Sequence, residues 1–233
     1  ALTARKIDEA EVSKGGEKRK VQLLSMTGIG FTPTSVWMTT GDSPQFGAYI
    51  FPGFIQLIED GWDANGVALE ARQVAAEKQL LVDFNKRLAH PMAGSTLIRN
   101  ARVFDSERAT LGAASDVLID AGRIIDVTPA GGERRKAARE IDAAGRVLMP
   151  GLFDMHVHLS AWDGGLHLAA GVTSVRDMGN DNATLLGLME RERAGTLLAP
   201  RVVPAGFIEG DSPFASRNGF VIKSLEEAKR ARL

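Results

Sequence analysis

Apolar and polar residues follow a strand-like pattern through the first third of the chain. Four short runs rich in β-branched and aromatic residues are separated by Gly, Pro and Asp, which is typical of antiparallel strands joined by turns. The spacing of the apolar residues then changes. Over residues 64–89 they recur at helical spacing, until His90-Pro91 ends the run. The pattern therefore predicts a helix over 64–89, preceded by strands at 19–28, 32–40, 47–51 and 53–62.

A second strand-rich segment follows a short linker at residues 91–95. Its extended apolar runs alternate with the dipeptides Ala121-Gly122 and Ala144-Gly145, whose glycines favour tight turns between strands. We expect a small β-sandwich segment built from the runs at 95–105, 115–129 and 139–151.

From Gly151 onward the pattern alternates between strands and helices. Such alternation predicts parallel β/α units. The predicted strands lie at 151–159, 172–179 and 200–207, and the predicted helices at 165–171 and 182–195. These amount to about three units, whereas a closed (β/α)8 barrel needs eight.

The predicted fold class is therefore α/β, with three regions. Residues 1–93 form a β-rich accessory region that ends in a connecting helix, residues 94–150 the β-sandwich segment, and residues 151–233 the first β/α units of an incomplete TIM-type barrel. The chain begins with Ala1, and the capping-box pattern of Ser224 and Glu227 starts a helix that is cut after about two turns. We expect a segment of a longer protein, inactive by itself.

Composition narrows the function classes. The 233 residues are 44% hydrophobic and 24% charged, with a net charge of −1, so no excess of basic residues suggests nucleic acid or an anionic membrane as partner. Without cysteine, a metal can be held only by histidines and carboxylates. No apolar run approaches the roughly 18–20 residues that span a bilayer, which predicts a soluble protein, cytoplasmic or exported.

The stretch PGLFDMHVHLS at residues 150–160 contains the strongest candidate site. On a strand, Asp154, His156 and His158 share one side, because successive side chains alternate between faces. Residues two apart lie about 6.5–7 Å apart along a strand, so two imidazoles can converge on one ion. The alternative is a pair of hydrogen-bonded histidines with a purely structural role.

The sequence on both sides of this histidine pair resembles that of the amidohydrolase superfamily. The resemblance rests on VLMPGLFDMHVHL, preceded by a β-rich segment and followed by LAAGVTSVRDMG, and it covers residues from about Thr96 onward. It is nearest to the branch that contains imidazolonepropionase-like proteins and Xaa-Pro or Xaa-Arg/Lys dipeptidases. The resemblance implies a (β/α)8 metallo-barrel, with His156 and His158 as metal ligands and Asp154 as a carboxylate that anchors the strand or supports the ligands.

The same resemblance implies a metal-dependent hydrolase of amide, dipeptide or cyclic amide C–N bonds. In that chemistry a metal-activated hydroxide attacks a carbonyl that the metal polarises. Zinc is the default ion for imidazole ligands, as one or two ions. The family completes its site with a lysine or carboxylate on a middle strand, two histidines on later strands and an aspartate on the last strand. None of these residues can be placed in this chain, so the catalytic residues are unknown. The rest of the barrel, or another chain, is therefore an expected partner.

Several residues and one other function remain alternatives. Arg176 and Asp177 are adjacent and so point to opposite faces of their strand; one could line the mouth of the site, or both could have structural roles. His90 and His167 are expected to be packed or on the surface, and the loop at 205–220 is a candidate substrate loop. The other function is a noncatalytic scaffold or interaction segment with a vestigial or shared metal site.

Overall fold

The computed structural model describes residues 1–53, 55–132, 135–215 and 219–231. The chain divides into two compact units. The first unit combines Ala1–Leu88 with Asp154–Leu233, and the second is Ala89–Phe153. The boundaries proposed above, at 93/94 and 150/151, stay a prediction.

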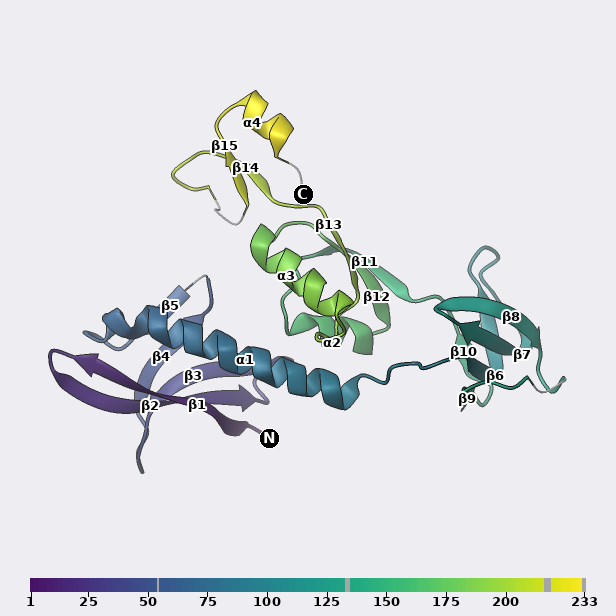
Figure 1. Ribbon diagram of the computed structural model, residues 1–233, viewed down its shortest axis with the longest axis horizontal. Coiled ribbons are helices and arrows are strands. Elements are labelled where there is room, and N and C mark those ends of the chain that lie inside the picture. Colours follow the sequence, from purple (N-terminus) through teal and green to yellow (C-terminus); the bar gives the residue numbers. More distant parts are fainter. Residues whose placement is uncertain (54, 133–134, 216–218, 232–233) are drawn as a thin grey trace. The chain divides into compact units, whose positions relative to one another are not determined.

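The N-terminal part of the first unit is a five-stranded antiparallel sheet (Figure 1). Neighbouring strands follow one another in sequence, as expected when short turns join antiparallel strands. The four predicted antiparallel strands are confirmed. The sheet also contains a strand before them that was not predicted. The strands are β1 (Thr3–Lys14), β2 (Glu17–Thr27), β3 (Thr34–Thr39), β4 (Phe46–Phe51) and β5 (Ile55–Ile58).

Strand β1 lies outside the predicted elements. Half of the residues in its sequence, TARKIDEAEVSK, are charged, and only Val12 is buried. It pairs with β2 along nearly its whole length, as the outermost strand of the sheet. Charged side chains on an edge strand prevent pairing with other chains, so an edge strand need not carry a strong apolar signal.

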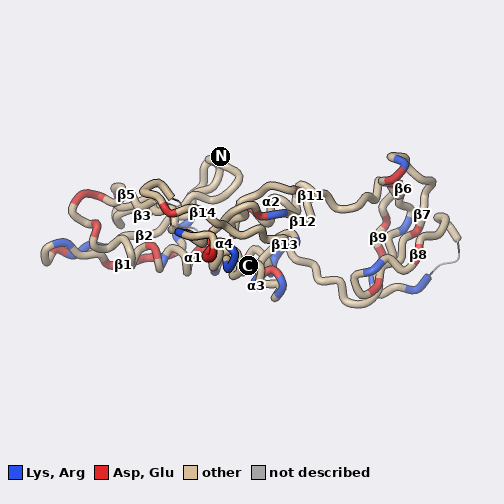
Figure 2. Tube along the Cα trace, turned by 90° about the horizontal axis from the view of Figure 1, so that it is seen from above, with Lys and Arg blue, Asp and Glu red and all other residues tan. Residues whose placement is uncertain are grey.

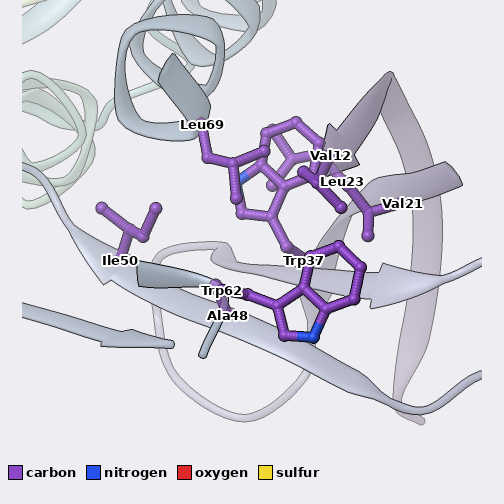
Figure 3. Packing of buried hydrophobic residues seen from close by; sticks show 8 residues of the cluster. All are labelled: Val12, Val21, Leu23, Trp37, Ala48, Ile50, Trp62 and Leu69. Carbon is purple, nitrogen blue, oxygen red and sulfur yellow. The ribbon is translucent and has the colours of Figure 1, made fainter. Parts of the chain in front are cut away.

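The helix predicted over 64–89 is confirmed as α1 (Gly66–Leu88), which follows a short 3-10 turn at Asp63–Asn65. Leu69 of α1 packs into a cluster of buried side chains from the sheet (Figure 3). Trp37 and Leu23 are completely buried in this cluster. The inward side chains of alternate strand positions and one face of α1 therefore build the core of this part. The cluster comprises Val12, Val21, Leu23, Trp37, Ala48, Ile50, Trp62 and Leu69.

A carboxylate lies against this core on the buried side of α1. The Glu77 side chain hydrogen bonds with Gln73, Ser35 and Trp162, and the Gln73 Nε2 donates to it at 3.0 Å. Burial raises the pKa of the Glu77 carboxyl above its ordinary value, and these hydrogen bonds offset only part of that effect.

The raised pKa of Glu77 predicts a stability that depends on pH. The folded protein keeps the Glu77 proton at pH values where the unfolded chain has lost it, so this contribution is fully present below about pH 4.5 and is lost as the pH rises through the folded pKa. We expect E77Q to flatten that decline and to be at least as stable as the wild type at pH 7. Urea unfolding at several pH values measures this, with exposed Glu190, as E190Q, for the control. A decline that E77Q leaves unchanged would contradict the assignment.

The C-terminal part of the first unit alternates strands with helices, as predicted. Strands β12 and β13 are parallel, and β11, β12 and β13 form one three-stranded sheet. Side chains of this sheet pack against Leu185 and Met189 of α3. The elements are β11 (Leu152–Val157), α2 (Asp163–Ala169), β12 (Val172–Asp177), α3 (Asn182–Arg193), β13 (Arg201–Pro204), β14 (Ile208–Gly210), β15 (Phe220–Ile222) and α4 (Leu225–Arg230).

Helix boundaries in this part follow local capping chemistry. The Asp181 carboxylate accepts a hydrogen bond from the Thr184 N–H at 2.8 Å at the start of α3, and the Ser224 hydroxyl accepts one from the Glu227 N–H at 3.2 Å at the start of α4. Gly171 and Gly195 adopt positive φ angles of 82° and 66° just beyond α2 and α3. The predicted starts and stops are confirmed at these positions.

The second unit is a five-stranded sheet in which β6 occupies a central place. It pairs antiparallel with β7 and parallel with both β9 and β10, while β8 pairs with β7. The predicted turns at Ala121-Gly122 and Ala144-Gly145 have all four residues at positive φ. The strands are confirmed, and they form one connected sheet, so a two-layered sandwich stays a prediction. They are β6 (Thr96–Asp105), β7 (Thr110–Asp120), β8 (Arg123–Pro129), β9 (Arg139–Asp142) and β10 (Val147–Leu148).

Charged residues of both signs are interspersed on the strands of each unit (Figure 2). On β1 and β2 they form ion pairs, such as Lys6–Glu9 at 2.5 Å and Lys18–Glu11 at 2.8 Å. In the part of the chain that the structure describes, no helix is both long and apolar enough to cross a membrane.

Candidate metal centre

Strand β11 carries the histidine pair to its C-terminal end. His156 lies within the strand and His158 directly follows it, and both side chains are exposed. Val157 and Leu159 point the other way, into the cluster with Leu185 of α3. The predicted alternation is thus confirmed at these positions. Phe153 and Met155, which lie closer to the start of β11 and were also predicted on the apolar side, are 70% and 52% exposed.

The spacing of the two imidazole rings fits one shared ion. The centroids of the His156 and His158 rings lie 5.5 Å apart, and the ring planes meet at 75°. If each nitrogen bound a tetrahedral zinc at 2.0–2.1 Å, the two centroids would lie about 5 Å apart. The distance between the ring centroids is therefore close to the value expected for two ligands of one ion, and the ligand roles stay a prediction.

A backbone carbonyl fixes the orientation of the His158 ring. The His158 Nδ1 lies 2.6 Å from the carbonyl oxygen of Gly179, in the loop after β12. Since a carbonyl oxygen can only accept, Nδ1 carries the proton and donates it. In the neutral ring the Nε2 atom then has a free lone pair, which is the form that binds metals.

Asp154 interacts with its own strand and with α2. Its Oδ1 accepts a hydrogen bond from the His156 N–H at 3.1 Å, and its Oδ2 lies 3.9 Å from the Nε2 of His167. These contacts agree with the strand-anchoring role considered for Asp154. They show no contact with either ring of the pair, so direct support of a ligand stays a prediction.

The side chains of Arg176 and Asp177 lie on opposite faces of β12, as their adjacent positions require. Arg176 is exposed, and its Nε donates to the Met155 carbonyl at 3.0 Å, which ties β12 to β11. The Asp177 side chain is completely buried, so it does not line an open mouth. Neither residue forms an ion pair within the described ranges, so both have contacts typical of structural roles.

The remaining histidines lie on other elements than the pair. His167 is on α2, where its Nδ1 donates to the Asp163 carbonyl at 3.0 Å, and His90 is exposed after α1. Among the described residues, no group of three or more His, Asp and Glu side chains could hold an ion. The predicted substrate loop at 205–220 contains β14 and the first residue of β15, and its residues 216–218 lie outside the described ranges.

Two residues that contact the candidate site were not singled out for it from sequence. Gly179 provides the carbonyl for His158, and the Asn180 Nδ2 donates to the Leu159 carbonyl at 2.9 Å. The only sequence signal was their position directly after a strand of a β/α unit, where functional loops occur. Parallel β/α units with two imidazoles at a strand end define an α/β protein with a candidate metal centre.

Comparisons with known proteins find two curated relatives that are similar to part of this chain. Adenine deaminase from Chelativorans sp. (strain BNC1) is 36% identical over 90 residues, which cover 39% of this chain and 14% of that protein. Dihydroorotase from Streptococcus pyogenes serotype M3 (strain ATCC BAA-595 / MGAS315) is 36% identical over 99 residues, covering 38% of this chain and 23% of that protein. No protein-family model matches the chain.

Solved structures show the same fold. A candidate prolidase from Bifidobacterium longum has a TM-score of 0.51 and 24% identity, covering 60% of this chain and 38% of that chain. A Xaa-Pro dipeptidase with bound methionine in its active site has a TM-score of 0.50 and 20% identity, covering 59% and 43%. The resemblance to the amidohydrolase superfamily is thereby confirmed. This chain spans less than a quarter of the length of the two curated relatives.

Proposed function

We propose that the full-length protein is a metal-dependent hydrolase of carbon–nitrogen bonds in amides, dipeptides or cyclic amides. The observation that carries the proposal is the pair of exposed imidazoles at the end of β11, with the His158 ring held in the tautomer that leaves Nε2 free. The named relatives, an adenine deaminase and a dihydroorotase, are hydrolases and support the class of reaction.

We assign the ligand roles to His156 and His158, with zinc as the default ion. A divalent ion held there would lower the pKa of water towards neutrality and polarise the carbonyl of a substrate. The two imidazoles, unlike carboxylates, bring no charge of their own, so the ion would keep its full positive charge at the site. Asp154 holds the His156 backbone, and β11, β12 and β13 begin the proposed (β/α)8 barrel, whose C-terminal strand ends would face the substrate.

Metal analysis of the full-length protein, followed by a screen of dipeptides and cyclic amides, tests this proposal. We expect about one or two equivalents of divalent metal, loss of hydrolysis after treatment with a chelator, and recovery on addition of zinc. A protein free of metal and inactive on all these substrates would favour the scaffold alternative. Hydrolysis that survives complete removal of metal would contradict the proposed chemistry.

A further inference from the structure

Asp177 is a buried carboxylate with three hydrogen-bond donors around it. It ends β12, its side chain is fully buried, and both of its oxygens accept hydrogen bonds. Oδ2 accepts from the Leu159 N–H at 2.8 Å and from the Asn180 Nδ2 at 3.0 Å, and Oδ1 accepts from the Gly179 N–H at 3.0 Å. A buried carboxylate is costly unless it is paired in this way, so the arrangement must be maintained by the fold.

The three donors come from the two loops that hold the candidate site. Leu159 directly follows His158 in the loop after β11, while Gly179 and Asn180 lie in the loop after β12. The Asn180 Nδ2 also donates to the Leu159 carbonyl at 2.9 Å, so one amide group joins both loops to Asp177. Asp177 thus links the ends of the neighbouring strands β11 and β12.

The Gly179 carbonyl lies in the chain between two groups that donate hydrogen bonds to Asp177. On one side lies the Gly179 N–H and on the other the Asn180 side chain, both of which donate to the same carboxylate. Between these two anchors the carbonyl accepts the His158 Nδ1–H at 2.6 Å. The position also lacks room for a side chain, because a Cβ on Gly179 would lie 2.6 Å from the Phe207 Cδ2.

We propose that Asp177 is a positioning residue for His158. Its carboxylate fixes the Gly179 peptide, whose carbonyl keeps the proton of the His158 ring on Nδ1 and leaves Nε2 as the acceptor for a divalent cation. The metal-binding half of this inference rests on the proposed function. The hydrogen-bonding half concerns the protein without metal and is tested separately.

The first measurement is the tautomer of His158. In full-length, metal-free protein labelled with 15N-histidine, long-range 1H–15N spectra distinguish a proton on Nδ1 from one on Nε2; H158A identifies the signal. We expect the wild type to carry the proton on Nδ1 and D177N to lose that preference, because an amide at this position replaces one acceptor with a donor that faces other donors. N180A, which removes one of the two anchors, should give a smaller change in the same direction.

The second measurement is zinc affinity in the same proteins. We expect D177N to raise the dissociation constant for zinc about 10–100-fold, as is usual when a partner of a ligand is lost. The matched control is D181N, which alters an exposed carboxylate that accepts the capping hydrogen bond of α3 from the Thr184 N–H. The Asp181 backbone N–H donates to the Asn180 Oδ1 at 3.0 Å, and this bond is kept in D181N. D181N should lower thermal stability, yet leave the tautomer unchanged and zinc affinity within about twofold.

The outcomes separate this inference from the proposed function. If D177N does not fold, N180A decides in its place. Variants that keep the Nδ1 proton and wild-type zinc affinity would overturn the positioning role. If the wild type binds no zinc but the tautomer still depends on Asp177, the positioning of His158 stands and the proposed metal centre fails.

Discussion

Replacing His156 or His158 by alanine in the full-length protein should abolish hydrolysis and most of the metal binding. Each change removes one of two imidazoles that share the end of β11, and among the described residues no third His, Asp or Glu side chain forms a metal-binding group with them. We expect kcat/KM to fall by more than about 1000-fold, or about 4 kcal/mol of transition-state stabilisation. In the absence of metal, H156A should change the free energy of unfolding by less than about 0.5 kcal/mol, because the His156 side chain is exposed. H158A should lower it by about 0.5–1.5 kcal/mol, because it also removes the hydrogen bond to the Gly179 carbonyl.

His167 provides the matched control for this prediction. It lies on α2, with its Nδ1 hydrogen bonded to the Asp163 carbonyl. H167A should therefore retain the metal content of the wild type, measured by elemental analysis of the purified protein, together with its turnover. A loss of metal in H167A equal to that in H156A and H158A would mean that the wrong histidines have been assigned.

The largest effect on stability is expected at Trp37. Its indole is completely buried in the cluster formed by the antiparallel sheet and α1 (Figure 3). Trp37→Ala leaves a cavity and should lower the free energy of unfolding by about 3–5 kcal/mol, a large share of the roughly 5–15 kcal/mol that stabilises a typical domain. Urea denaturation followed by circular dichroism measures the change.

Phe31 is the aromatic control for Trp37. Its side chain is 95% exposed, so Phe31→Ala should change the free energy of unfolding by less than about 0.5 kcal/mol. W37F, which keeps an aromatic ring in the core, should be less destabilised than the alanine variant and extends the test if that variant cannot be purified. Equal effects of the changes at Trp37 and Phe31 would contradict the described core.

Sequence patterns predicted the parts of the candidate site that depend on local chemistry. The alternation on β11 predicted that His156 and His158 share a side, and their ring centroids do lie 5.5 Å apart, in an edge-to-face arrangement. The adjacency of Arg176 and Asp177 predicted opposite faces, which their exposure and burial confirm. What each of the latter two side chains contacts could not be predicted, because their partners lie on other elements.

The sequence by itself determined the positions of most strands and helices, because periodicity and capping act over only a few residues: Asp181 caps α3 through Thr184, three positions away. Tertiary structure alone decided that Glu77 is half-buried and that β1, in which half of the residues are charged, joins the sheet. It also decided the tautomer of His158, because the Gly179 carbonyl that fixes it lies 21 positions away. Such partners meet only when parallel strands align their ends, and no local pattern records that alignment.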